Sequence, residues 1–292
     1  MVRIARVFPC KTKFTPEDDD VFFRSPGLLE EGRYAEVHVS CVFSWHKEKA
    51  ESLAKGWRRV CNDVKVGGPA YDDPGGEFVP GMYVRFGHVM TSRGCPKRCP
   101  FCLVPLREGK LRELEVKEGY DIVDNNLLAC SRDHVEKVFD MLEGQKGITF
   151  TGGLDAEFLQ DWHIDRLVSL GSRFRYGYFA YDLPRDRDSV EDALRKCHEA
   201  GLKQQQLGCY VLVGFEGDTV DKAYRRCEWV FTQGGIPFPM YYRSSDVAEK
   251  KKSKKWTEFA NVWGYPMFSI SRVAKEGLRY HGRCVRGKLA DV

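Results

Sequence analysis

The sequence lacks a long hydrophobic run. Although 42% of its 292 residues are hydrophobic, no apolar stretch approaches the ~18–20 residues that a helix needs to cross a bilayer. It also lacks a signal-peptide pattern, because Pro9 and charged residues follow the strand-like segment Ile4–Phe8 before an apolar core can form. We therefore expect a cytoplasmic protein with no membrane partner.

The sequence also lacks a strong excess of either charge. Its 46 Lys and Arg residues against 42 Asp and Glu residues give a net charge of +4, and the two signs are mixed along most of the chain. Charge alone therefore predicts no nucleic-acid partner. The run Lys250–Lys255, next to Trp256, is typical of a solvated loop, and it gives only weak support for contact with nucleic-acid phosphates.

Cysteine, in contrast, is plentiful. Eleven cysteines in a chain without a secretion signal favour thiols that bind metals or fill the core over a disulfide framework. Cys197 and Cys227 fall on the apolar faces of two expected helices, so we expect them in the core.

From residue 88 onward, strand-like segments alternate with amphipathic helices, for two of which Ser131 and Thr219 are candidate N-caps. This alternation predicts an α/β fold built around a parallel sheet. The six expected strands are His88–Ser92, Tyr120–Asn125, Gly147–Thr151, Arg175–Tyr181, Leu207–Gly214 and Pro237–Tyr242.

The first part of the chain has a different pattern. Strand-like and helical segments within residues 1–70 predict a small Rossmann-like α/β unit, and the Gly-, Asp- and Pro-rich segment 71–87 predicts a linker loop. We expect the repeat core over residues 88–243 and a C-terminal extension over residues 244–292.

Cys95, Cys99 and Cys102 form a C-x3-C-x2-C pattern just after the first strand of the repeat region. Functional sites in α/β folds gather at such strand ends. The spacing lets one loop supply three thiolates to an iron–sulfur cluster while one iron keeps no protein ligand. A closed zinc site needs a fourth ligand, and neither Cys nor His follows Cys102 at short range.

At these residues the chain resembles the radical S-adenosylmethionine (SAM) superfamily, whose signature is this cysteine loop after the first strand of a partial (β/α)6 barrel. The resemblance implies a [4Fe-4S] cluster on Cys95, Cys99 and Cys102, with SAM chelating the open iron. It also implies an external one-electron reductant similar to flavodoxin or ferredoxin. Phe101, before the third cysteine, would lie beside the SAM adenine.

Two further stretches are similar to family features. Gly152-Gly153 resembles the glycine pair that offers its backbone to the SAM amino group, although Leu154 replaces the usual acidic residue. The segment Asp124-Asn125-Asn126, which closes the second expected strand, could supply these contacts instead, with Asp124 and Asn126 as the main candidates. Gly214 ends a segment that resembles the fifth strand, which backs the adenine.

Several alternatives stay open. The layout is similar to uncharacterised radical SAM proteins of phage and bacterial genomes, and the N-terminal unit resembles a shortened cobalamin-binding domain. A cobalamin-dependent enzyme is therefore possible, although no D-x-H-x-x-G motif surrounds His38 or His46. A methylthiotransferase would need a second cluster, for which Cys10, Cys41 and Cys61 are candidates, but we favour buried thiols.

A non-enzymatic zinc or iron–sulfur module is the rival from another class. The sequence predicts no substrate. Tyr181, Tyr210 and Cys209 are strand residues that could face either the barrel interior or the helices, and alternation alone cannot assign them.

Overall fold

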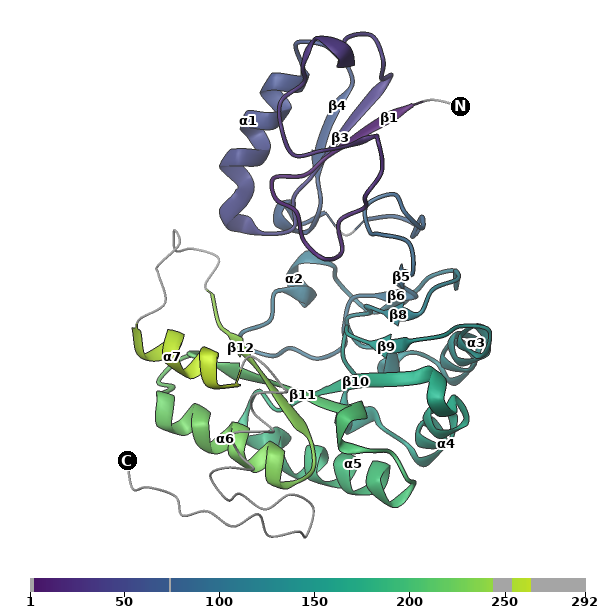
Figure 1. Ribbon diagram of the computed structural model, residues 1–292, viewed down its shortest axis with the longest axis vertical. Helices are drawn as coiled ribbons and strands as arrows, with labels where there is room; N and C mark the ends of the chain where they lie inside the picture. Colours follow the sequence, from purple (N-terminus) through teal and green to yellow (C-terminus); the bar gives the residue numbers. More distant parts are fainter. Residues whose placement is uncertain (1–2, 74, 244–253, 264–292) are drawn as a thin grey trace. The chain divides into compact units, whose positions relative to one another are not determined.

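The computed structural model describes residues 3–73, 75–243 and 254–263 of the chain (Figure 1). These residues fold as two compact units, one within residues 1–125 and the other beginning at Asn126. Both contain α-helices and parallel strands, which confirms the α/β class. The linker predicted at 71–87 lies within the first unit, and a domain boundary there stays a prediction. Lys250–Lys252 lie outside the described residues.

The first unit opens with a four-stranded parallel sheet in the order β2-β1-β3-β4. Its strands are β1 (Ile4–Val7), β2 (Val21–Phe22), β3 (Glu36–Ser40) and β4 (Val64–Gly67). Figure 1 shows helix α1 (Lys47–Trp57) lying along this sheet. The sequence predicts β1, β3, β4 and α1, whereas β2 has only two residues and no recognisable pattern.

The core of this sheet lies under α1. Trp57 is fully buried, and its indole Nε1–H donates to the Arg24 carbonyl oxygen at 3.1 Å. Burial of one such side chain stabilises a fold by roughly 2–3 kcal/mol. Val37 and Val39 of β3 are buried in the same cluster. Because side chains alternate along a strand, Glu36, His38 and Ser40 lie on the opposite, more polar face.

The rest of the first unit carries the cysteine loop. Strands β5 (His88–Val89) and β8 (Asp121–Ile122) pair in parallel, whereas β6 (Ser92–Arg93) and β7 (Arg112–Glu113) pair antiparallel around the short helix α2 (Val104–Arg107). The 3-10 helices of this unit are η1 (Leu28–Glu30), η2 (Ser44–His46) and η3 (Pro69–Tyr71).

The second unit is built on four parallel strands paired in sequence order. They are β9 (Ile148–Phe150), β10 (Phe174–Ala180), β11 (Leu207–Val213) and β12 (Ile236–Tyr241). Its helices are α3 (Arg132–Glu143), α4 (Asp161–Ser169), α5 (Arg187–Glu199), α6 (Val220–Thr232) and α7 (Lys254–Trp263). Its 3-10 helices are η4 (Leu127–Ala129), η5 (Ala156–Phe158), η6 (Gly171–Arg173), η7 (Pro184–Asp186) and η8 (Gln204–Gln206).

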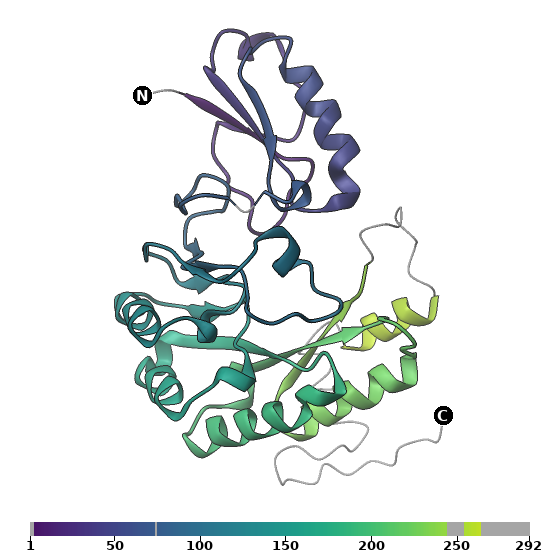
Figure 2. The ribbon, with the colours of Figure 1, turned by 180° about the vertical axis from the view of Figure 1, so that it is seen from behind.

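Helices α4, α5 and α6 lie along one face of these strands (Figures 1 and 2). The predicted caps are confirmed, because Ser131 Oγ accepts from the His134 N–H and Thr219 Oγ1 from the Lys222 N–H, each at 3.3 Å. Cys197 and Cys227 are fully buried core residues, as predicted. Burial raises the pKa of the Cys197 thiol to about 12. None of the described helices is long and apolar enough to cross a membrane.

The two faces of the second sheet differ. On one face, the rings of Tyr178 and Tyr210 stack with centroids 4.3 Å apart and an interplanar angle of 12°, and Phe238 packs edge-on against Tyr210. The residue before Tyr210 on β11, Cys209, is fully buried and points to the other side. Tyr181, just after β10, packs against Trp229 of α6 with ring centroids 4.9 Å apart. The face of this sheet that packs against the helices is therefore a buried core, and aromatic rings cover the opposite face.

Candidate metal centre

Cys95, Cys99 and Cys102 lie on the loop between β6 and α2, and all three are half-buried. The Cys102 N–H donates to the Cys99 carbonyl oxygen at 3.0 Å, which closes a tight turn between the second and third cysteines. Five other described cysteines are buried: Cys41, Cys61, Cys197, Cys209 and Cys227. The three predicted ligands are thus partly exposed residues of a single loop.

The segments before and after this loop are held together. Strands β6 and β7 pair at Ser92–Glu113 and Arg93–Arg112, so the chain leaves and returns at one place. Beside them, Arg93 Nε donates to Glu108 Oε2 at 2.8 Å, and both side chains are largely buried. The loop therefore projects from a fixed base.

The backbone at Gly94 turns directly before the first cysteine. Its φ of +82° lies in the left-handed region, and a Cβ there would collide with the Lys110 carbonyl oxygen. The Gly94 N–H donates to Asn125 Oδ1 at 2.9 Å. Glycine is thus required at this position, and Asn125, in the segment that follows β8, holds its N–H.

Asp124 holds the two residues before this turn. It is only 1% exposed, and its Oδ1 accepts from the Thr91 N–H at 2.6 Å. Its Oδ2 accepts from Thr91 Oγ1 at 2.6 Å and from Ser92 Oγ at 2.8 Å. Burial raises the pKa of the Asp124 carboxyl, and the hydrogen bonds from Thr91 and Ser92 oppose this shift. Both carboxylate oxygens are therefore engaged within the protein.

This arrangement also explains why the strand predicted at His88–Ser92 is broken. It ends as β5 at Val89, and the Thr91 N–H turns to the carboxylate of Asp124 instead of a sheet partner. Thr91 and Ser92 are positioning residues that the sequence reasoning did not identify, and Asn125, expected with Asp124 and Asn126 as a polar contact to SAM, holds Gly94. The sequence does contain a pattern that could have identified them. Polar residues lie at the ends of the first two expected strands of the repeat region, and the carboxyl ends of parallel strands lie at the same edge of a sheet.

Asn126 and the glycine pair lie in the second unit. Asn126 is 3% exposed, and its Nδ2 donates to Asp155 Oδ2 at 2.9 Å. Gly152 and Gly153 follow β9, and Gly153 has a φ of +109°. Leu154, where the family has an acidic residue, is 3% exposed and fills the core. The structure thus gives Leu154 a packing role.

Gly214 ends β11 in a turn that needs glycine. Its φ is +79°, and a Cβ would lie 2.8 Å from the Tyr241 ring. Its N–H donates to Asp218 Oδ2 at 2.8 Å, and the same carboxylate pairs with Arg226. Phe101 is half-buried within the cysteine loop. Contact of Phe101 or Gly214 with SAM stays a prediction.

In the part of the chain that the structure describes, no three His, Cys, Asp or Glu side chains form a group able to hold a metal ion. The fold places Cys95, Cys99 and Cys102 on one loop. Their donor chemistry nevertheless fits an iron–sulfur cluster, because three accessible thiols lie within eight residues of irregular backbone.

The cysteines considered for a second cluster, Cys10, Cys41 and Cys61, each contact another group of the protein. Cys41 Sγ–H donates to the Phe43 carbonyl oxygen at 3.3 Å, and Cys61 Sγ–H to that of Ala35 at 3.5 Å. Cys10 Sγ lies 3.4 Å from His46 Nδ1. Burial raises the pKa of the Cys41 thiol. Cys41 and Cys61 are therefore buried thiols, as predicted, whereas Cys10 is partly exposed.

His38, considered as a cobalamin ligand, uses both of its ring nitrogens within the protein. Its Nε2 lies 3.0 Å from Glu36 Oε2 and its Nδ1 lies 2.5 Å from the Tyr83 hydroxyl. Neither nitrogen is presented to a metal in this arrangement.

A scan of protein-family models and a search of curated proteins find no match to this chain.

Proposed function

We propose that the protein is a radical SAM enzyme that reductively cleaves SAM at a [4Fe-4S] cluster held by Cys95, Cys99 and Cys102. The carrying observation is the cysteine loop itself: three partly exposed thiols on one loop whose start is fixed by Asp124 and Asn125. The parallel strands β5 and β8 and the parallel set β9 to β12 support a partial (β/α)6 barrel as its scaffold.

When bound, the cluster would pass one electron from an external flavodoxin- or ferredoxin-like reductant to SAM, which would split into methionine and a 5′-deoxyadenosyl radical that takes a hydrogen atom from the substrate. The residues of the protein would position the cluster and SAM and would shield the radical from solvent. A loop with a fixed base delivers its three thiols with less loss of conformational entropy than a free segment would.

In this proposal Asp124 positions the loop instead of touching SAM. Both of its oxygens already accept hydrogen bonds from Thr91 and Ser92, so a further donor such as the SAM ammonium would have to compete with them. The contacts to SAM are then assigned to Phe101, Asn126, Gly152, Gly153 and Gly214.

The proposal is tested by anaerobic reconstitution of the full chain with iron and sulfide. We expect about four irons per chain, a cubane EPR signal after reduction with dithionite, and release of 5′-deoxyadenosine from SAM. The variant Cys99→Ala should lose most of the signal and of the product. Retention of both by Cys99→Ala would overturn the proposal.

Cys10→Ala is the matched control, because Cys10 is also partly exposed but lies outside the loop. It should leave the iron content and the product unchanged. Loss of a second cluster in Cys10→Ala would instead favour a methylthiotransferase. One zinc per chain and no iron after anaerobic purification would favour the non-enzymatic metal module.

A further inference from the structure

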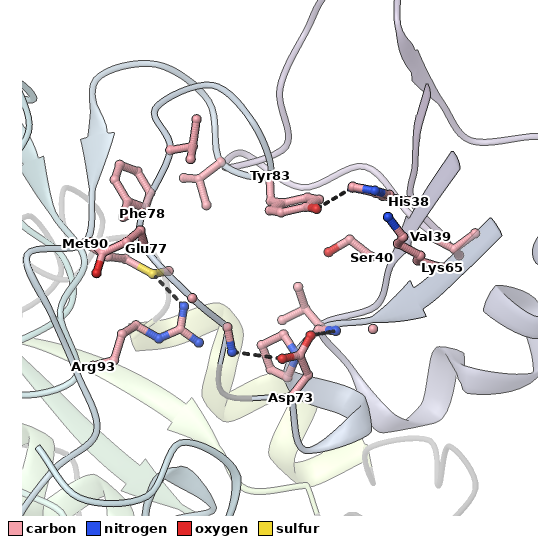
Figure 3. Close-up of a pocket in the computed structure, with 18 of the residues that line it drawn as sticks. His38, Val39, Ser40, Lys65, Asp73, Glu77, Phe78, Tyr83, Met90 and Arg93 are labelled. Atoms are coloured by element: carbon pink, nitrogen blue, oxygen red, sulfur yellow. Dashed lines mark hydrogen bonds between the residues drawn. The ribbon is translucent and has the colours of Figure 1, made fainter. Parts of the chain in front are cut away.

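A cavity of about 340 Å³ lies in the first unit, on the face of β3 and β4 that points away from α1 (Figure 3). Its floor is formed by His38 and Ser40 of β3 and by Lys65 of β4, and the segment 75–84 covers it. Nothing in the proposed radical chemistry uses this cavity.

Glycine keeps the floor of the cavity open. Gly67 is the register partner of Ser40, so no side chain stands beside the Ser40 hydroxyl on β4. The next residue, Gly68, has a φ of +99°, and a Cβ there would lie 2.8 Å from the Cys41 carbonyl oxygen. The chain therefore turns away sharply at the end of β4 and leaves a hollow above the strand.

The walls of the cavity are mainly apolar. Val42, Phe78, Val79, Val84 and Met90 line it. Val42 is 47% exposed and Val79 is 57% exposed, so apolar surface continues from the cavity to its mouth. Concave sites with such walls and a few polar groups typically bind small organic molecules.

The charged groups around the cavity are largely neutralised by one another. Lys65 Nζ lies 2.5 Å from Glu36 Oε2, and Arg93 is paired with Glu108. The Asp73 carboxylate accepts from two backbone N–H groups, those of Gly68 at 3.2 Å and Gly75 at 2.9 Å. Glu77 stands at the exposed rim. A charged ligand would lose its hydration without gaining an unpaired partner inside.

Two hydroxyl groups supply the polar contacts. The Tyr83 hydroxyl donates to His38 Nδ1 when Nε2–H donates to Glu36, which leaves the phenol oxygen able to accept. Burial raises the pKa of Tyr83, so this hydroxyl keeps its proton. Figure 3 shows the Ser40 hydroxyl directed into the cavity, and among the described residues it has no hydrogen-bond partner.

We infer that this cavity binds a small, uncharged compound of about two fused rings that carries one hydroxyl or amide group. A cavity of about 150 Å³ accommodates benzene, so 340 Å³ has room for two rings. The rings contact the apolar walls, and the polar group hydrogen-bonds to Ser40 and Tyr83.

The test is a calorimetric titration of the full chain with 2-naphthol and with naphthalene-2-sulfonate, which has the same rings but carries a charge. We expect one saturable site for 2-naphthol and affinity for the sulfonate at least about tenfold lower. Equal affinity for the two compounds, or no saturable binding of 2-naphthol, would overturn the inference.

Two variants locate the site. Ser40→Phe fills the cavity and should abolish binding, whereas Ser40→Ala removes one hydrogen bond and should weaken binding about fivefold without changing the fold. Leu29→Ser is the control, because Leu29 is 85% exposed and lies outside the cavity. If neither Ser40 variant changes the affinity for 2-naphthol, the compound binds elsewhere and the inference is wrong. This outcome is independent of whether the protein cleaves SAM.

Discussion

Replacement of Asp124 by alanine should release the start of the cysteine loop. The change leaves three buried donors without their acceptor: the Thr91 N–H, the Thr91 hydroxyl and the Ser92 hydroxyl. The hydroxyls can rotate toward other acceptors, but the backbone N–H cannot. Since a buried donor left without a partner costs about 1–3 kcal/mol, and a small cavity adds to this, we expect a loss of about 3–5 kcal/mol.

Asp124→Asn should be milder. Its Oδ1 can still accept from the Thr91 N–H, and its amide group can donate to the two hydroxyls if they turn to accept. The expected loss is then about 1–2 kcal/mol. The difference between the two variants separates loss of the hydrogen bonds from loss of the negative charge.

The assay combines urea unfolding with hydrogen exchange of the peptide that contains Thr91. In Asp124→Ala, the amide hydrogens of this peptide should exchange faster than in the unmodified protein. The variant should also bind less iron after reconstitution. Asp19, which is exposed in the same unit, provides matched Ala and Asn controls that should change neither quantity. Normal stability and normal exchange in Asp124→Ala would refute the positioning role. Faster exchange together with normal iron binding in Asp124→Ala would confirm that Asp124 positions the loop start, but would show that cluster binding does not depend on this positioning.

Three further outcomes are expected. Gly94→Ala should lower stability by about 2–3 kcal/mol in urea unfolding and reduce iron binding, because φ there is +82° and the methyl group meets a carbonyl oxygen. Gly214→Ala should cost a similar amount without lowering iron binding, since its methyl group meets the Tyr241 ring. Burial, with a smaller contribution from a nearby arginine, lowers the pKa of His163 to about 4. In the unfolded chain the His163 imidazole binds a proton near pH 6.5, whereas in the folded chain it stays neutral until about pH 4. The free energy of unfolding should therefore fall by about 1–2 kcal/mol as the pH drops from 6.5 to 4. Unfolding of His163→Gln across this range should show a smaller fall.

The sequence predicts the strands of the second unit well. Strands β9 to β12 begin and end within one or two residues of the predicted ranges, because each is an apolar run bounded by Gly, Asp or Pro. The two-residue strands β2 and β7 have no such pattern. They form because neighbouring strands position them, which is a tertiary effect that no local pattern encodes.

The role of Asp124 illustrates a second limit. An acidic residue at the end of a strand suits both a ligand contact and the anchoring of a neighbouring loop, and the sequence does not separate the two. Only the distances to Thr91 and Ser92 assign it to anchoring. The anchoring role of Asn125 could not be predicted for the same reason, because its partner is a backbone N–H that any residue except proline could provide.

The three strand residues that could border a radical, Tyr181, Tyr210 and Cys209, can now be separated. Cys209 is fully buried, and burial raises the pKa of its thiol well above the usual value. Tyr181 packs on α6 through Trp229. Tyr210 alone of the three lies on the aromatic face, where its hydroxyl donates to the Thr151 carbonyl oxygen at 2.8 Å, directly before the glycine pair. If the strands close into the proposed barrel, this face is the interior, because the helices occupy the other side. Tyr210 is then the residue that borders the reaction space, and the thiol of Cys209, a ready hydrogen-atom donor, is kept out of it by the sheet.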